Sequence, residues 1–193
     1  LLNNQQLTEL KKVIYQKIRV EKMAVKDAKL RTFITADNDR DGLVGHVYDV
    51  TYGVAQHTDT LVILDDSIVR GTTLKRSILR ILDRLKFRKI IVVSSAPQIR
   101  YPDCYGIDMA KLGDFIAFRA AISLLKKSPS GKDIIQKTYQ KCKAAMLQKK
   151  EDQINHLKDL YVPFSNNEIS KEVANLLKTD NISTDFDIVF QKV

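Results

Sequence analysis

The chain has 193 residues, 44% of them hydrophobic, and a net charge of +9, which suits one core with a small appendage. No run of about 18 apolar residues is present, which excludes a membrane span, and charges throughout the N-terminal segment exclude a signal peptide. The two cysteines, Cys104 and Cys142, exclude a disulfide framework and a cysteine-rich metal site, so we expect a reducing, cytoplasmic setting and no membrane partner.

The predicted elements, taken in chain order, include both helices and strands. Apolar residues at helical spacing predict a helix over 7–18, and a segment rich in Asp, Gly, Asn and Thr predicts a loop over 35–53. The remaining elements are a strand over 61–64, a helix over 74–85, a strand over 90–93, helices over 112–127, 132–160 and 165–178, and an edge strand over 186–190. A strand–helix–strand order is typical of a parallel sheet with helical crossovers. The predicted fold class is therefore α/β, a parallel sheet flanked by helices.

A break in composition divides the predicted elements. Ser128-Pro129-Ser130-Gly131 is the strongest linker signal in the chain. We therefore predict an α/β domain over residues 1–127 and a mostly helical C-terminal extension over 128–193.

Much of the positive charge lies between residues 125 and 158, which hold nine lysines against three acidic residues. A basic segment suits nucleic acid, but it is only the first of several signs of such a partner. The favoured interpretation is a solvated helix face, because apolar residues at helical spacing would form a buried side opposite the lysines. These residues are Ile135, Tyr139, Cys142 and Met146.

The strongest chemical signal is the thirteen-residue string Leu61 to Thr73. A buried strand ends in Asp65 and Asp66, and a short turn with a glycine and hydroxyls leads into a helix. Ligands of open α/β sheets bind beyond the carboxyl ends of strands, and a helix N-terminus favours phosphate. Paired carboxylates suit ribose hydroxyls and Mg²⁺. The alternative is a plain strand-to-helix connection capped by Thr72 or Thr73.

This string resembles the phosphoribosylpyrophosphate (PRPP) motif of type I phosphoribosyltransferases. The version Asp-Asp-Ser-Ile-Val-Arg-Gly-Thr-Thr is similar to that of the glutamine PRPP amidotransferases. Two further segments match that family in the same order, Arg31-Thr32-Phe33-Ile34 and Arg100 to Asp108. The resemblance covers roughly residues 31–120 and implies a type I phosphoribosyltransferase-like sheet, truncated at its N-terminal side.

The resemblance implies a role for each matching residue. Asp65 and Asp66 would contact the ribose hydroxyls and help to hold Mg²⁺, and Arg31 would act from a loop. The 5′-phosphate would be bound by Ser67, Ile68, Val69, Arg70, Gly71, Thr72 and Thr73. The implied reaction is displacement of pyrophosphate at the anomeric carbon by ammonia, with no general base nominated in this chain.

Several features of the family have no counterpart in this sequence. Residue 1 is leucine, whereas the family's glutaminase domain begins with a nucleophilic cysteine, so ammonia would come from a domain outside these residues. The pyrophosphate-binding loop has no counterpart in residues 1–30, and Arg40 and His46 are the only candidates in the loop after Ile34. With two cysteines, the chain cannot build a four-cysteine iron–sulfur cluster.

Three expectations about assembly and activity follow from the resemblance. The full enzyme is expected to be a homo-oligomer and to bind purine nucleotides as inhibitors. The isolated chain is expected to be poorly active or inactive.

Two other functions stay open at this point. One is a PRPP-sensing regulator whose basic surface contacts nucleic acid, although no helix-turn-helix pattern supports it. The other is a phosphoribosyltransferase acting on a free base, although a lysine-rich helix stands where a base-binding hood of strands would be expected.

Overall fold

The computed structural model describes residues 3–15, 19–21, 24–26, 48–50, 56–103, 109 and 111–192. The chain forms two compact units, Leu1–Val54 and Ala55–Val193. The first unit holds helix α1 (Asn4–Ile14) and two short antiparallel strands, β1 (Ala24–Lys26) and β2 (Tyr48–Val50). The predicted catalytic residue Arg31 lies outside the described residues.

Helix α1 begins at a capping box. The Asn3 side chain accepts from the Gln6 backbone N–H, and the Gln6 side chain accepts from that of Asn3, so two otherwise unpaired donors of the first turn are satisfied. Lysines in the last turn complement the negative end of the helix dipole. None of the described residues of α1 is buried.

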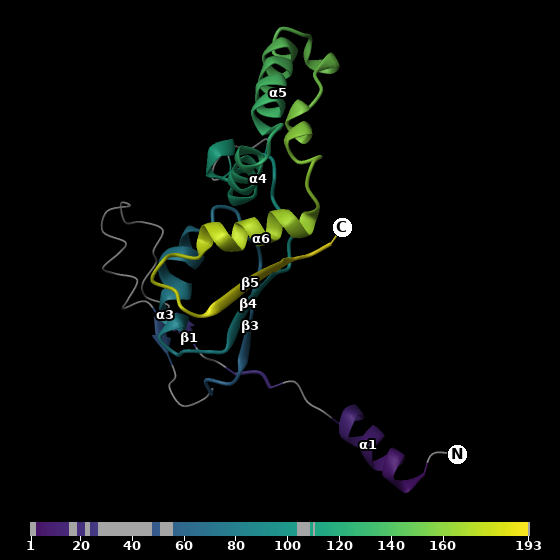
Figure 1. Cartoon of the computed structure of the whole chain (residues 1–193), viewed down its shortest axis with the longest axis vertical. Helices are drawn as coiled ribbons and strands as arrows, with labels where there is room; N and C mark the ends of the chain where they lie inside the picture. Colours follow the sequence, from purple (N-terminus) through teal and green to yellow (C-terminus); the bar gives the residue numbers. More distant parts are fainter. Residues whose placement is uncertain are drawn as a thin grey trace. The chain divides into compact units, whose positions relative to one another are not determined.

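The second unit is built on a parallel sheet of three strands in the order β3-β4-β5 (Figure 1). Their bounds are β3 (Thr60–Asp65), β4 (Lys89–Ser94) and β5 (Asp185–Phe190). Leu61 pairs with Ile90, and Ile90 pairs with Phe186. Runs of β-branched and other apolar residues favour strands buried in a parallel sheet. The predicted α/β class is confirmed, and so is the C-terminal edge strand.

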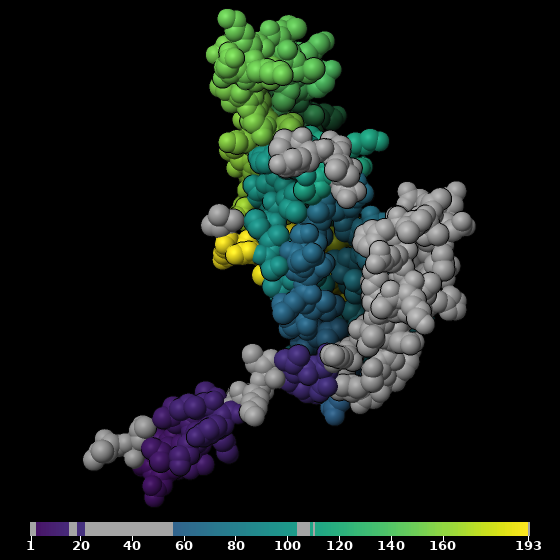
Figure 2. All heavy atoms as spheres, turned by 180° about the vertical axis from the view of Figure 1, so that it is seen from behind, coloured from purple at the N-terminus to yellow at the C-terminus, as the bar shows by residue number. Residues whose placement is uncertain are grey.

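The two faces of this sheet differ in burial. On one face Ile90, Val92 and Ile188 are at most 6% exposed. On the other face Val62 is 54% exposed and Leu64 is 80% exposed. Seen from behind, the blue atoms of the β3 region lie at the surface (Figure 2). Since all-parallel sheets are normally covered on both faces, the open face fits an incomplete domain.

Eight helical segments are described in the second unit. They are η1 (Leu74–Ile78), α3 (Leu79–Asp83), η2 (Leu112–Asp114), α4 (Ile116–Lys127), α5 (Gly131–Ala145), η3 (Lys150–Asp152), η4 (His156–Leu160) and α6 (Asn166–Leu177). Helix α6 packs on β5 and α4, and α5 packs on α4 and η4 (Figure 1). No helix of the described ranges is long and apolar enough to cross a membrane.

A buried carboxylate joins α4 to α6. Glu172 is 5% exposed and accepts hydrogen bonds from Ser123 Oγ at 2.6 Å and Lys127 Nζ at 2.7 Å. Burial alone would raise the pKa of Glu172, but the hydrogen bonds from Lys127, Ser123 and Asn175 leave it below the ordinary value. The buried Glu172 carboxylate therefore has both hydrogen-bond partners and an opposite charge, as a buried charge requires.

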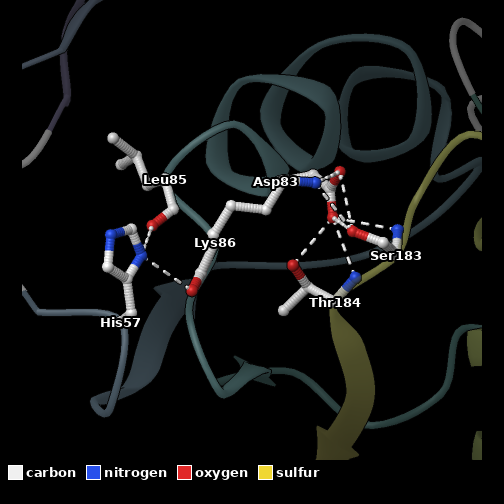
Figure 3. A network of polar contacts seen from close by, with 6 residues as sticks. All are labelled: His57, Asp83, Leu85, Lys86, Ser183 and Thr184. Carbon is white, nitrogen blue, oxygen red and sulfur yellow. Dashed lines mark hydrogen bonds and ion pairs between the residues drawn. The ribbon is translucent and has the colours of Figure 1, made fainter.

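A second buried carboxylate joins α3 to the segment before β5 (Figure 3). Asp83 Oδ1 accepts from the backbone N–H groups of Ser183 at 3.0 Å and Thr184 at 2.8 Å, and from Thr184 Oγ1 at 2.7 Å. Lys86 Nζ lies 3.3 Å from Asp83 Oδ2. Nearby, His57 Nδ1 lies 3.1 Å from the carbonyl oxygen of Leu85. The hydrogen bonds of Asp83 fix the start of β5 against the end of α3.

The predicted helix over 132–160 is wrong in its extent. Helix α5 ends at Ala145, and the rest of the predicted range holds only the short turns η3 and η4. The run Gln148 to Gln153 is polar on every side, so it offers no face that a longer helix could bury.

The predicted buried side of α5 is also wrong in part. Tyr139 is 59% exposed and Met146 is 79% exposed, whereas Thr138 and Ala145 are buried. The buried stripe is displaced by one residue, because Thr138 and the small Ala145 lie on the side that faces the rest of the unit.

The division of the chain differs from the predicted boundary between residues 127 and 128. Strand β5, from the predicted extension, completes the same sheet as β3 and β4. The unit therefore runs from Ala55 to Val193.

Candidate functional site

Asp65 and Asp66 stand at the carboxyl end of β3, where the strand meets the turn. The carbonyl oxygen of Asp65 accepts from Ser95 N–H at 2.9 Å, and that of Asp66 accepts from Ala96 N–H at 3.0 Å. Ser95 Oγ also donates to the Asp66 carbonyl at 3.1 Å. The segment after β4 therefore fixes the backbone of Asp65 and Asp66.

The Asp66 carboxylate acts electrostatically on Asp65. Burial raises the pKa of Asp65 above its ordinary value, and the neighbouring Asp66 carboxylate adds to the rise. The Asp66 side chain is exposed. A like-charged pair of this kind is stabilised by hydroxyl donors or by a divalent cation.

The turn after the carboxylates is anchored by its side chains and backbone. Ile68 is 3% exposed, so its side chain belongs to the core. The carbonyl oxygen of Val69 accepts from Ile116 N–H at 2.8 Å, and Arg70 Nε lies 3.8 Å from Asp114 Oδ2. The start of α4 and the end of η2 thus hold the turn in place.

Gly71 allows the chain to enter the following helix. Its φ of 70° lies in the left-handed region, and a Cβ atom there would come within 2.6 Å of Leu177 Cδ2. Both constraints favour glycine. The close approach brings this turn directly against α6.

The helix that follows presents its N-terminus at the turn. Thr72 and Thr73 are its exposed first residues, and within the described ranges their N–H groups have no acceptor, as is usual at a helix start. Lys75 N–H bonds the Gly71 carbonyl at 2.9 Å, and Lys75 Nζ bonds the Leu176 carbonyl at 2.8 Å. The positive end of this helix therefore lies a few residues from the two carboxylates.

One turn of this helix is wider than an α-helix. Leu79 N–H bonds the carbonyl of Leu74, five residues earlier, across the π-helical turn η1. Such turns are rare and often occur at functional sites.

The carboxylates fit Mg²⁺ only together with oxygens from elsewhere. No group of three or more His, Cys, Asp or Glu side chains suited to a metal occurs in the described part of the chain. Mg²⁺ in proteins is often bound through one or two carboxylates, with waters and substrate phosphates completing the shell. Asp65 and Asp66 match that donor set.

The structure brings together part of the predicted site. Residues Asp65 to Thr73 form one continuous strand end, turn and helix start. Arg31, Arg40, His46 and residues 104–108 lie outside the described residues.

Sequence reasoning did not include the residues that support this turn, which are Ser95, Ala96, Asp114 and Leu177. A signal existed for the first two, because the carboxyl ends of adjacent parallel strands lie at the same edge. The other two come from distant parts of the sequence and carry no local signal.

Comparison with known proteins supports the resemblance indicated by the motif. No protein-family model matches the chain. An amidophosphoribosyltransferase of Pasteurella multocida is 40% identical over 67 residues, and one of Pyrococcus horikoshii is 42% identical over 67 residues, each alignment covering 35% of this chain. One of Schizosaccharomyces pombe is 35% identical over 80 residues, or 42% of this chain.

Part of this chain is similar to amidophosphoribosyltransferases. The predicted resemblance is therefore confirmed. The alignments cover 13–15% of the length of these amidophosphoribosyltransferases, so the chain corresponds to a small part of each.

Proposed function

We propose that this chain is the phosphoribosyltransferase portion of an amidophosphoribosyltransferase acting in purine synthesis. It would take PRPP and ammonia to 5-phosphoribosylamine and pyrophosphate. The proposal rests on one arrangement: Asp65 and Asp66 at a strand end are followed by Gly71 in the left-handed conformation and then by a helix N-terminus. Relatives named amidophosphoribosyltransferase, 35–42% identical over their aligned parts, support it.

The turn would bind the sugar phosphate at two points. The N–H groups and hydroxyls of Thr72 and Thr73 suit the 5′-phosphate, because an exposed helix start attracts anions. Asp65 and Asp66 suit the 2′ and 3′ hydroxyls of the ribose, which can donate to carboxylates. Ser67, Ile68, Val69 and Arg70 would act mainly through the position of their backbone, since Ile68 is buried and Arg70 is paired with Asp114.

In the proposed reaction one bond forms and one breaks at the anomeric carbon. The bond from this carbon to the pyrophosphate oxygen breaks, and the nitrogen of ammonia bonds to the carbon. Pyrophosphate leaves with the electron pair, and a proton leaves the new ammonium group. Positive charge grows on the sugar ring, and carboxylates placed beside it stabilise that charge. No residue of this chain is assigned as a general base.

Mg²⁺ would supply positive charge to neutralise the pyrophosphate as it leaves, held in part by Asp65 and Asp66. Arg31 remains the predicted loop residue for catalysis. Ammonia would come from a glutaminase domain outside these 193 residues. Purine nucleotide inhibitors and a homo-oligomeric full enzyme belong to the same proposal.

Calorimetric titration of residues 1–193 with ribose 5-phosphate and then PRPP, each with MgCl₂, tests the proposal. We expect dissociation constants from micromolar to millimolar, about 4 to 8 kcal/mol of binding free energy. Ribose without the phosphate is the matched control and should bind at least tenfold more weakly. A folded sample that binds neither sugar phosphate up to millimolar concentration would contradict the assignment.

A further inference from the structure

The outer edge of β5 has no partner strand among the described residues. β5 is the last strand in the order β3-β4-β5. Just past its end, Gln191 N–H bonds the carbonyl of Ser94, the last residue of β4. Because successive residues of a strand alternate the direction of their backbone groups, the N–H and C=O of Ile188 and Phe190 face away from β4. Such an edge is a template for a further extended strand.

A cleft follows this edge. Its volume is about 570 Å³, within the range of ligand-binding pockets. Its lining includes every residue from Asp187 to Lys192, together with residues of the first two turns of α6, namely Asn166, Asn167, Ser170 and Lys171. Helix α6 runs across β5 in Figure 1. The cleft is therefore bordered by consecutive residues of a free strand edge and by a helix.

One wall of the cleft is held rigid. The Arg100 guanidinium donates to Gln98 Oε1 at 2.7 Å and to Asn166 Oδ1 at 2.6 Å, and lies 4.8 Å from the centre of the Tyr161 ring. Gln98 also donates to the carbonyl of Asn166 at 2.8 Å. A preformed wall reduces the entropy lost when a ligand binds.

The charge of the cleft is positive. Arg100, Lys171 and Lys192 line it, and Asp187 is the one carboxylate among its described lining residues. Asp187 Oδ2 lies 2.5 Å from Lys89 Nζ, which also pairs with Asp185 Oδ2 at 3.2 Å, so Lys89 offsets part of the negative charge beside the cleft. Within the described ranges, Lys171 and Lys192 form no ion pair.

We propose that this cleft binds an extended acidic peptide segment of a partner protein, which adds to β5 as a fourth strand. Backbone hydrogen bonds to Ile188 and Phe190 would supply affinity, as in other cases of strand addition. Carboxylates of the peptide would pair with Lys171 and Lys192, which selects acidic sequences. A second copy of this chain fits less well, because a two-fold contact at this edge would bring like basic groups together.

The experiment measures fluorescence anisotropy of a fluorescein-labelled heptapeptide that alternates Glu and Val, added to residues 1–193. Saturable binding is expected. The same heptapeptide with every backbone nitrogen methylated keeps its charge but cannot pair as a strand, and a heptapeptide with Gln in place of Glu keeps its backbone but loses its charge. Each should bind about tenfold more weakly or worse.

Variants of the protein show where the Glu–Val heptapeptide binds. Lys171→Glu combined with Lys192→Glu should weaken binding of the Glu–Val heptapeptide about tenfold. Lys178→Glu, at the other end of α6 and outside the cleft, is the matched control and should leave binding unchanged. Circular dichroism confirms that each variant is folded.

Several results would overturn the proposal. If the N-methylated heptapeptide bound as tightly as the unmodified one, binding would depend on charge alone and not on strand pairing. If Lys178→Glu weakened binding equally, the heptapeptide would bind outside the cleft. If single-stranded DNA of matched charge bound as tightly, the surface would be a general site for polyanions. Sedimentation showing self-association that Lys171→Glu abolishes would assign the edge to a second copy of the chain.

Discussion

Replacing Asp83 with asparagine keeps the shape of the side chain and removes its charge. In the folded protein burial acts to raise the pKa of Asp83, but hydrogen bonds from Thr184 and Lys86 outweigh it and lower the pKa from 3.8 to about 2. The side chain is 10% exposed, so solvent screens these interactions little. At 1.36 kcal/mol per pKa unit, the ionised form stabilises the fold by about 2 kcal/mol.

The stabilisation by Asp83 depends on pH in a defined direction. A carboxyl group whose pKa is lower in the folded state contributes its stability above the unfolded pKa and loses it as pH falls through the folded pKa. The contribution should therefore be complete at pH 5 to 7 and should decrease between about pH 4 and pH 2. Asp83→Asn should lose about 2 kcal/mol at pH 7 and much less near pH 2.

Urea denaturation followed by circular dichroism measures this difference at pH 7, 5, 3 and 2. Asp180→Asn is the matched control, because Asp180 is exposed and a surface substitution should change stability by less than about 0.5 kcal/mol. If Asp83→Asn behaves like this control at pH 7, or if its deficit stays constant down to pH 2, the assigned role of the carboxylate is wrong.

Three further predictions concern two glycines and the paired carboxylates. Gly71→Ala should cost about 2 kcal/mol through its left-handed backbone and its contact with α6, whereas Gly113→Ala, with no atom within 4 Å of the added Cβ, should be nearly neutral in thermal melts. Gly131→Ala should destabilise by about 3 kcal/mol or more, because the added Cβ would lie 1.7 Å from a backbone carbonyl oxygen; a melting temperature equal to that of the parent would refute this. Asp65→Asn and Asp66→Asn should weaken ribose 5-phosphate binding about tenfold or more in calorimetry while changing the melting temperature little, and the reverse pattern would indicate structural caps.

The sheet was predictable because its strands are short apolar runs. Leu61 to Leu64, Ile90 to Val93 and Phe186 to Phe190 each carry the residues that favour buried strands, and each prediction is confirmed within one residue at either end. The position of Asp65 and Asp66 at a strand end follows from the same pattern. Local sequence was sufficient in these cases.

Long-range contacts account for what the sequence did not predict. Asp83 looks like an ordinary charged residue at a helix end, and its partners Ser183 and Thr184 are 100 and 101 residues away. The buried stripe of α5 was placed one residue out of phase because Tyr139 and Met146 fit helical spacing as well as Thr138 and Ala145 do. Only packing against the rest of the unit distinguishes the two phases.

The most direct test of the central claim is to map a bound sugar phosphate onto the backbone. Amide resonances of ¹⁵N-labelled residues 1–193 are recorded during titration with ribose 5-phosphate and MgCl₂, with ribose alone as the control. We predict that the largest shifts fall on Asp66, Gly71, Thr72 and Thr73 and that ribose alone leaves them unchanged. Saturable binding that leaves these amides unshifted, with shifts confined to other parts of the chain, would contradict the proposed site.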